Sequence, residues 1–407
     1  SLRFNDNDSP YLSRQPSSNT SGSSQKITIS FWIKLGNIPS GTNGGTFFGT
    51  AGDNHRGQFF NQEFYFGNAS YWINTTSLVR DPSAWYHVVY VVDTTQGTST
   101  NRQKIYVNGV LQDRGDTIND PSQNAYFDYF NNSSETYYIG RRQSGNYFDG
   151  YLAEINFIDG SALTPSSFAE TDAVTGEYKP KKYTGGYGTN GFYLNFSDNS
   201  GTTATTLGKD SSGNGHNFTP NNFVTGDSVK DSPTNNFCTL NPLNSQNTNL
   251  SEGNLKGEIT NATGNRTTVA TMGVKSGKWY YEVLYNSQSS DSVTIGFGDE
   301  SYNALHGNNK LFEDHTPSIG YRGNNNIYSN TSTSSTSTTF TSGDIIGVAA
   351  DLDNNQIYFY KNGTVNSNTN PLSYTFSDTF FIPAITNLTS GGNQTITANF
   401  GQDSTFA

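Results

Sequence analysis

The sequence predicts an all-β protein of two antiparallel β-sandwich, or jelly-roll, domains joined by a loop-rich connector. Short runs of β-branched and aromatic residues recur along the chain, separated by Asn, Gly, Pro and Ser, as is typical of strands and turns. The 3.6-residue period of amphipathic helices is nearly absent. The hydrophobic fraction is only 32%, but 25 Tyr and 27 Phe supply large buried area per residue. At 407 residues, the chain is long enough for two or three domains.

The first predicted sandwich covers residues 1–170. An Asn-Gly pair, Asn108-Gly109, lies between two apolar runs and predicts a tight hairpin. One short helix of one or two turns is expected at residues 164–170, where Pro165 suits the first helical position. The strands of this domain are expected at residues 26–33, 85–92, 104–111, 137–140 and 150–158.

The second predicted sandwich covers residues 251–407 and shows the same alternation of strands and turns. Between the two domains, residues 171–250 are rich in Gly, Asn and Pro, and are interpreted as an ordered connector that lends strands to either neighbour. The polar tract at residues 329–341 fits either a loop or an edge hairpin. The clearest strands beyond residue 170 are expected at residues 191–196, 278–285, 293–298, 345–352 and 356–360.

The charge balance restricts the kinds of partner. With 23 Lys and Arg against 34 Asp and Glu, the formal net charge is −11, and no basic block occurs. Nucleic acid and anionic membrane surfaces are therefore not expected as partners, whereas neutral sugars are compatible. A single cysteine, Cys238, excludes an internal disulfide scaffold. No run is apolar enough to span a bilayer and the start lacks a signal-peptide core, so we expect assembly in a cytoplasm without membrane insertion.

Particular segments of both predicted sandwiches are similar to known families. The run 85–89, the hairpin at 105–109 and the strand at 150–155 resemble the laminin-G-like, concanavalin A-like family over roughly residues 1–170. Residues from about 251 to 407 resemble a SPRY domain. The segments that carry this second resemblance are 277–283, 295–297, 343–348, 357–363 and 399–402.

The tandem of these two domains is similar to surface proteins of tailed-bacteriophage virions, as are the opening residues 2–5 and 9–12 and the connector residues 231–237. This resemblance implies a non-enzymatic structural and binding protein on the virion surface: a tail fibre, a spike or a capsid fibre. Its implied partners are other virion proteins and a host cell-surface glycan. A purely structural capsid decoration protein is an alternative. The sequence has no heptad repeat, and so no helical stalk is predicted. A homo-oligomer such as a trimer would therefore form through the sandwiches themselves.

A polysaccharide-degrading enzyme is the second alternative, because glucanases share the concanavalin A-like fold. Those enzymes carry alternating acids on one strand, so that two carboxylates face the same substrate. The nearest match here is Glu154, but Asn156 replaces the middle acid and Asp159 is followed by a turn glycine. We therefore predict no catalytic residues and interpret the segment as a structural strand.

Clusters of Asp and Asn raise the question of calcium, which prefers several oxygen ligands. Asp6, Asp8 and Asp210 are the candidate ligands, and laminin-G-like domains often carry calcium on a rim of the sandwich. Neither the cluster around Asp6 and Asp8 nor the one around Asp210 has the EF-hand spacing, and Asp and Asn residues serve turns equally well. No cofactor is expected, with calcium as the alternative.

Aromatic and amide residues near the SPRY-like strands are the candidate ligand contacts. Aromatic faces stack on sugar rings, amides hydrogen-bond to hydroxyls, and loops commonly carry binding residues. The candidates lie between two predicted strands or just after the next one: Tyr302, Asn303, His306, Tyr321, Arg322 and Asn324.

Overall fold

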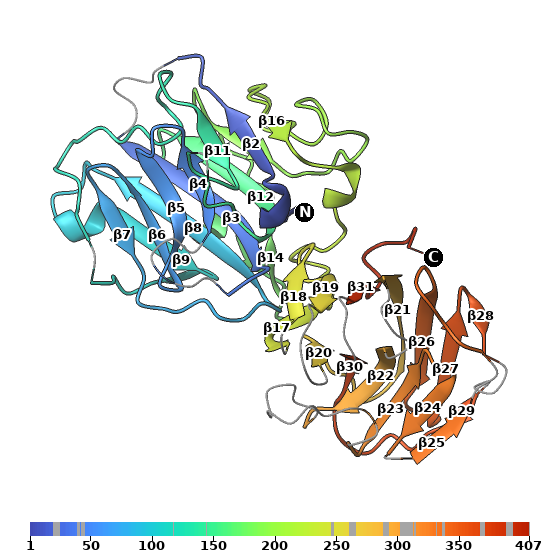
Figure 1. The fold of residues 1–407 in the computed structure, drawn as a ribbon. Helices are drawn as coiled ribbons and strands as arrows, with labels where there is room; N and C mark the ends of the chain where they lie inside the picture. Colours follow the sequence, from blue (N-terminus) through green and yellow to red (C-terminus); the bar gives the residue numbers. More distant parts are fainter. Residues whose placement is uncertain are drawn as a thin grey trace. The chain divides into compact units, whose positions relative to one another are not determined.

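The computed structural model divides the chain into two compact units, Ser1–Asn236 and Phe237–Ala407, and each unit is described by itself (Figure 1). The residues that the structure describes are 1–18, 25–38, 41, 45–116, 118–143, 145–245, 248–259, 266–287, 293–301, 312, 315–330, 332–335, 338–366, 371–387 and 394–406.

The first unit is a sandwich of two sheets whose paired strands run antiparallel. In sheet order, the β3 sheet consists of β1 (Leu2–Phe4), β12 (Gly150–Asp159), β3 (Lys26–Leu35), β8 (Trp85–Asp93), β9 (Gln103–Val107) and β10 (Val110–Leu111), with β15 (Phe192–Leu194) also paired to β12. The β5 sheet consists of β16 (Thr219–Asn221), β2 (Tyr11–Arg14), β11 (Tyr137–Ile139), β4 (Thr46–Thr50), β5 (His55–Phe60), β6 (Glu63–Asn68) and β7 (Trp72–Asn74).

Aromatic side chains from both sheets fill the core of the first unit. Phe31 of β3 lies 4.9 Å, between ring centroids, from Phe48 of the opposite sheet, in an edge-to-face arrangement. Tyr90 of β8 stacks on Phe66 of β6 at 4.6 Å. All four side chains are fully buried, so a few large rings provide the apolar area that the composition otherwise lacks.

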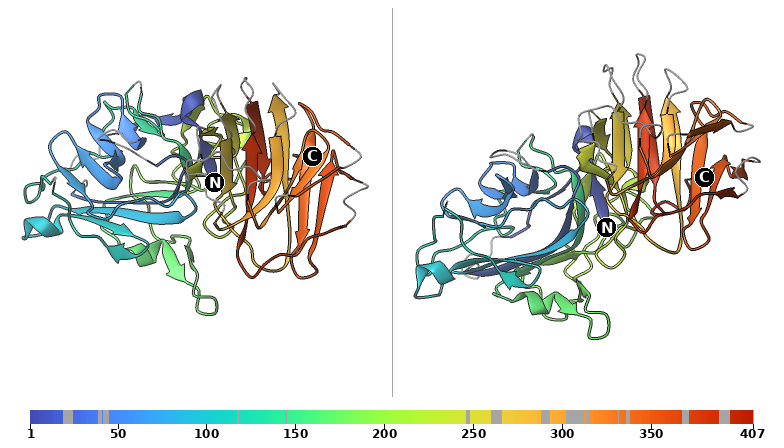
Figure 2. Two further views of the ribbon diagram at one scale, coloured as in Figure 1. Left: turned by 60° about the horizontal axis from the view of Figure 1, so that its bottom comes forward. Right: turned by 90° about the horizontal axis from the view of Figure 1, so that it is seen from below.

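The outer face of the β3 sheet is also covered. The hairpin β13 (Ala169–Thr171) and β14 (Tyr178–Pro180) packs Ala169 and Tyr178 against Trp32 and Trp85 (Figure 2, green). The predicted connector, residues 171–250, divides between the units. Its strands β14, β15 and β16 belong to the first unit, whereas β17 and β18 belong to the second.

The second unit is a second sandwich, again with antiparallel pairs. In sheet order, the β22 sheet consists of β17 (Leu240–Ser245), β20 (Arg266–Ala270), β30 (Phe381–Asn387), β22 (Val293–Asp299), β23 (Ser318–Arg322), β24 (Asn326–Ser329) and β25 (Ser332–Ser335). The β21 sheet consists of β18 (Thr248–Ser251), β19 (Lys256–Ile259), β31 (Gln394–Asn399), β21 (Lys278–Ser287), β26 (Ile345–Asp351), β27 (Gln356–Lys361) and β28 (Thr364–Val365), with β29 (Leu372–Ser373) also paired to β27.

The core of the second unit again lies between its two sheets. Tyr321 of β23 contacts Phe359 of β27 across the sandwich, with ring centroids 5.7 Å apart. Tyr281 of β21 meets Phe297 of β22 edge to face at 5.4 Å. The predicted all-β fold class of two antiparallel sandwiches is thus confirmed.

Helical structure is scarce. The helix predicted at residues 164–170 is a single 3₁₀ turn, η4 (Pro165–Ser167), which leads directly into β13. The other 3₁₀ turns among the described residues are equally short: η1 (Asp6–Asp8), η3 (Ser99–Asn101) and η5 (Thr225–Asp227). None of the helical segments in these residues has the length and apolar character needed to span a bilayer.

Asn-Gly pairs close two hairpins, as their sequence predicts. In the second unit, Asn362 and Gly363 both have positive φ, 49° and 74°, and link β27 to β28. This matches a two-residue turn whose twist suits the flanking strands.

Replacing Gly363 with alanine should lower the stability of the second unit by about 1–2 kcal/mol, because a Cβ disfavours positive φ. No atom lies within 4 Å of the position that the new Cβ would take, so the loss would come from the backbone alone. Differential scanning calorimetry would measure it. Gly97→Ala, which also adds a Cβ in open space but lacks a positive φ, is the control and should change little. An unchanged unfolding midpoint for Gly363→Ala would contradict the turn geometry.

Candidate functional site

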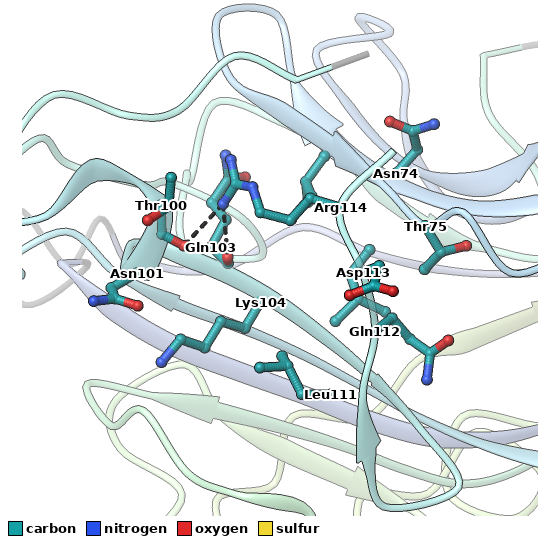
Figure 3. A pocket seen from close by; sticks show the side chains of 12 residues that line it. Asn74, Thr75, Thr100, Asn101, Gln103, Lys104, Leu111, Gln112, Asp113 and Arg114 are labelled. Atoms are coloured by element: carbon teal, nitrogen blue, oxygen red, sulfur yellow. Dashed lines mark hydrogen bonds between the residues drawn. The ribbon is translucent and has the colours of Figure 1, made fainter. Parts of the chain in front are cut away.

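A cavity of about 260 Å³ lies at one open edge of the first sandwich, and we call it the edge cavity (Figure 3). It is bordered by β7, the edge strand of the β5 sheet, and by β9 and β10, the edge strands of the β3 sheet. Its lining residues are Ile73, Asn74, Thr75, Thr100, Asn101, Gln103, Lys104, Ile105, Leu111, Gln112, Asp113 and Arg114.

The segment after β10 crosses from one sheet to the other and closes this edge. The Asn108-Gly109 turn reverses the chain, so that Leu111 pairs with Tyr106 and the backbone N–H of Gln112 donates to Ile105. The segment then meets the opposite sheet, where Thr75 and Arg114 form an isolated bridge. Backbone bonds on both sides therefore give the edge cavity a fixed wall.

Arg114 ties the cavity to the turn η3. Its guanidinium donates to the backbone oxygens of Thr100 and Gln103 at 2.9 and 3.4 Å (Figure 3). It also donates to both carboxylate oxygens of Asp120, at 2.7 and 2.8 Å. These four hydrogen bonds hold the side chain in one geometry, so Arg114 is part of the frame and its charge is balanced.

Several polar groups of the lining have no partner among the described residues and are available to a ligand. Lys104 is half-buried, and its ammonium makes no ion pair or hydrogen bond within the described residues. The same holds for the exposed side chains of Asp113 and Asn101. Figure 3 shows Lys104 and Leu111 side by side, with Asp113 on the crossing segment. Donors, an acceptor and an apolar contact thus surround one small space.

This lining suits a small, neutral, polyhydroxylated ligand. An ammonium donates three hydrogen bonds, a carboxylate accepts them, and an amide does both, so together they can satisfy several hydroxyls. Lys104 and Asp113 carry opposite charges, and Arg114 is neutralised by Asp120. The lining therefore has no excess of either sign. Ile73, Ile105 and Leu111 add the apolar surface that ligand pockets commonly have.

The predicted ligand residues of the second unit are not brought together by the described structure. Tyr302, Asn303 and His306 lie outside the described residues. The prediction that Tyr321 and Arg322 follow a strand was wrong, because both are the last residues of β23 and are buried.

The buried positions of these two residues follow from their packing. Tyr321 has no exposed surface and donates its hydroxyl to the backbone oxygen of Thr338 at 2.6 Å. Arg322 lies over the ring of Tyr328, 3.9 Å from its centroid, and donates to the hydroxyl of Thr294. A role for these side chains in ligand binding remains a prediction that neither contact supports.

Asn324 is exposed, as predicted, and accepts the backbone N–H of Asn326 through its side chain, which is turn chemistry. Asp299 and His315 flank the segment that contains Tyr302 and His306. Their side chains are buried and hydrogen-bonded at 2.7 Å, so the two ends of that segment are joined.

The calcium candidates are occupied by local hydrogen bonds. The carboxylate of Asp210 accepts the backbone N–H groups of Tyr193, Ser212 and His216 and the hydroxyl of Ser212, at 2.8–2.9 Å. Asp8 accepts the amide of Asn5 at 2.6 Å. Asp6 is partly desolvated, which raises the pKa of its carboxyl.

No cluster of three or more His, Cys, Asp or Glu side chains gathers in the residues that the structure describes. The hydrogen bonds at Asp210 and Asp8 favour turn chemistry over calcium at these positions.

The glucanase-like segment of β12 forms a structural network. Glu154 lies at a β-bulge with φ 51° and accepts the hydroxyl of Tyr193. Burial raises the pKa of Glu154, although this hydrogen bond acts in the opposite direction. Asn156 donates to the backbone oxygen of Glu154 and accepts the hydroxyl of Tyr187. Asp159 is buried and accepts the backbone N–H of Asn190. These contacts join β12 to residues 187–193 and bring no second carboxylate of this segment beside Glu154.

Sequence reasoning did not select the edge-cavity residues, although a usable pattern was present. A two-residue turn at Asn108-Gly109 sets the register of the hairpin, so residues equally distant from the turn become neighbours. Polar residues occur on both sides of that turn, at 101–104 and 112–114. The position of β7 beside this hairpin is a tertiary fact, and without it the cavity could not be located.

Two family descriptions match the chain, one for each unit. The concanavalin A-like lectin/glucanases superfamily matches residues 6–169, and the SPRY domain matches residues 278–403. No curated protein sequence matches the chain.

Solved structures that resemble the chain include two SPRY domains. The SPRY domain of human HERC1 is 18% identical, with 40% of this chain and 99% of that chain covered and a TM-score of 0.32. The TRIM65 PSpry domain is 16% identical, with 40% and 89% covered and a TM-score of 0.31. Stonustoxin is 20% identical over 40% of this chain, with a TM-score of 0.32, and the match spans only 27% of the stonustoxin chain.

Proposed function

We propose that this chain, in which a concanavalin A-like domain is followed by a SPRY domain, is a non-enzymatic binding protein of a phage particle that contacts host surface glycans. The order of the two domains is the one that the sequence predicts. Domains of both kinds generally bind other molecules, which agrees with a binding role.

The edge cavity is the observation that carries the glycan part of the proposal. It is small and charge-balanced, and its ammonium, carboxylate and amide groups that have no partner among the described residues lie beside apolar side chains. The low charged fraction of the whole chain, 14%, and its net charge of −11 favour neutral hydroxyl-rich ligands over anionic polymers.

The virion part of the proposal is supported by the resemblance of the tandem and of residues 231–237 to phage surface proteins. It places the chain on the virion surface as a fibre or spike, assembled in the host cytoplasm with other virion proteins. Edge strands of the sandwiches are the proposed joining surfaces of a homo-oligomer such as a trimer. The proposal requires no cofactor.

Lys104→Met should weaken binding to host polysaccharide by about tenfold or more, because a charged hydrogen-bond donor is lost while the aliphatic stem is kept. Lys182→Met removes an exposed lysine of the same unit away from the cavity lining and is the matched control. Affinity electrophoresis of the purified chain through gels that contain host polysaccharide would measure both variants.

Equal mobility of the parent and Lys104→Met in these gels would contradict the cavity as the binding site. If the parent binds neither polysaccharide nor host cells, the purely structural decoration role is favoured. Release of new reducing ends from the polysaccharide would favour the enzymatic alternative.

A further inference from the structure

The outer face of the β21 sheet carries a second feature suited to sugars. Side chains alternate along its strands, and one set, which includes Tyr281, Val283 and Val348, fills the core of the unit. The other set points away from that core. On the three neighbouring strands it consists of Tyr280, Glu282 and Leu284 of β21, Ile345, Gly347 and Ala349 of β26, and Tyr358 and Tyr360 of β27. Figure 1 shows these strands in the second unit.

Tyr280 reaches over the neighbouring strand at a position where that strand has a glycine. A Cβ added to Gly347 would lie 2.5 Å from the Tyr280 hydroxyl and 3.0–3.1 Å from two carbons of its ring. The ring therefore occupies the space that any larger residue at position 347 would fill. Tyr280 is nevertheless 50% exposed, so half of its surface remains open to solvent.

Tyr360 is the second neighbour of the ring. The two rings meet edge to face, with centroids 6.2 Å apart and an interplanar angle of 86°. Edge-to-face pairs are favourable because the positive ring edge meets the negative ring face. The ring of Tyr280 thus has Gly347 and a second tyrosine as its neighbours on this face.

Hydrogen-bonding groups lie at the rim of the ring. The hydroxyl of Tyr280 donates to Glu282 at 2.8 Å, and the amide of Asn399 donates to the other oxygen of that carboxylate at 3.2 Å. Each carboxylate oxygen has two lone pairs, so Glu282 retains capacity to accept hydroxyl donors. An aromatic face with an acceptor at its rim matches a pyranose ring, whose C–H groups and hydroxyls lie side by side.

The charges of this face select against acidic sugars. Lys278 pairs with Asp351 at 3.0 Å, so these two charges cancel locally. The donors to Glu282 described above are neutral, which leaves a net negative charge at the rim. A uronic acid or a sulfated sugar would be repelled, whereas a neutral sugar would not.

We propose that Tyr280, neighboured by Gly347 and Tyr360 and flanked by Glu282, binds a pyranose ring of a neutral polysaccharide. We call this set the tyrosine platform. The inference rests on the proposed function for its ligand class, but it concerns the second unit and residues that take no part in the edge cavity. It gives the chain two sugar contacts, one on each unit, which can strengthen attachment to a polymer with repeating sugars.

The test is affinity electrophoresis of the full chain through gels that contain dextran, laminarin or galactomannan, with alginate as the acidic comparison. Tyr280→Ala should weaken binding to the neutral polymers that the parent retains by about tenfold, because a stacking face and its buried area are lost. Tyr280→Phe keeps the ring and should keep most of the affinity. Gly347→Ala keeps the tyrosine but displaces its ring and should weaken binding as Tyr280→Ala does.

Trp279→Ala is the matched control. Trp279 is the next residue on the same strand, is 51% exposed and donates its indole N–H to the backbone oxygen of Ser276, outside the platform. The Trp279→Ala variant should have the same mobility as the parent in the polysaccharide gels. Far-ultraviolet circular dichroism and melting temperatures would show that each variant is folded.

The outcomes distinguish this inference from the proposed function. Loss of binding in Lys104→Met but not in Tyr280→Ala or Gly347→Ala would overturn the tyrosine platform and retain the edge cavity. Loss in both platform variants but not in Lys104→Met would support the platform and overturn the cavity. A parent chain that binds none of the neutral polymers, or that binds alginate more tightly than all of them, would overturn the platform.

Discussion

Replacing Asp231 with alanine is expected to lower the free energy of unfolding of the first unit by about 3–5 kcal/mol, because it leaves a buried lysine without its counter-charge. Lys34 has no exposed surface and donates to Asp231 at 2.7 Å and to the side chain of Asn236 at 2.7 Å. Trp85 donates its indole N–H to the second oxygen of Asp231 at 2.9 Å. One carboxylate therefore joins β3, β8 and the last residues of the unit.

Urea unfolding followed by tryptophan fluorescence would measure this loss, since three of the four tryptophans, Trp32, Trp72 and Trp85, lie in the first unit. Glu170→Ala is the matched control. It removes one partner of an ion pair with Lys181 in the same unit, 3.9 Å long and about half exposed, and should cost less than about 1 kcal/mol.

The double variant Lys34→Met/Asp231→Ala tests the physical reason. It removes both charges and should recover part of the stability lost in Asp231→Ala alone. The assigned role of this pair would be contradicted if the free energy of unfolding of Asp231→Ala lay within 1 kcal/mol of that of the parent. It would also be contradicted if the double variant were no more stable than Asp231→Ala.

Acidification is expected to destabilise the first unit through His87. This side chain has no exposed surface, and burial lowers the pKa of its imidazole from its ordinary value near 6.5 to about 3. Its ring stacks on Trp32 and is hydrogen-bonded to the hydroxyls of Ser30 at 2.9 Å and Tyr178 at 3.0 Å. These contacts suit the neutral imidazole ring. None of them carries a negative charge that would stabilise the protonated, positively charged ring.

The direction of this change in stability with pH depends on whether the folded or the unfolded chain binds the proton. Between about pH 6.5 and pH 3 the unfolded chain protonates His87 and the folded chain does not, so protons favour unfolding. The histidine is neutral in both states above this window and causes no loss there. Within the window, stability should fall by about 1.4 kcal/mol for each unit of pH.

Urea titrations at several pH values would measure this slope in the parent and in His87→Gln, where the contribution should disappear. Tyr178→Phe is the control, because it removes one hydrogen bond but keeps the buried imidazole, and its slope should match that of the parent. The assignment fails if His87→Gln retains the parent's slope. Glu154 acts in the opposite direction, since its raised pKa favours the folded state at low pH, and the comparison between variants removes this common contribution.

The sequence predicted much of the fold because strands and turns are marked locally. The run at 85–92 became β8 (Trp85–Asp93), and the Asn108-Gly109 pair became the turn between β9 and β10. The short strands β4–β7 carried weaker patterns and were not predicted, although β4 and β6 contribute Phe48 and Phe66 to the core. Their pairing depends on neighbours that alternation alone does not identify.

Burial was the part that local patterns predicted least well. Tyr321 and Arg322 were expected after a strand on a loop, but they end a strand whose two faces are both covered. Asn324, only two residues later, is exposed as expected. A shift of two residues in a strand boundary therefore separates a core position from a surface position.

The amino-acid sequence by itself determined the all-β class, the order of the two sandwiches and the hairpin turns, because side-chain alternation and turn chemistry act over a few neighbouring residues. Only the tertiary structure decided which polar side chains share a space. Lys34 meets Asp231 across 197 residues, the edge cavity needs β7 beside β9, and Tyr280 has room for its ring because Gly347 is on the neighbouring strand. Each of these depends on strand order and register, which long-range packing sets.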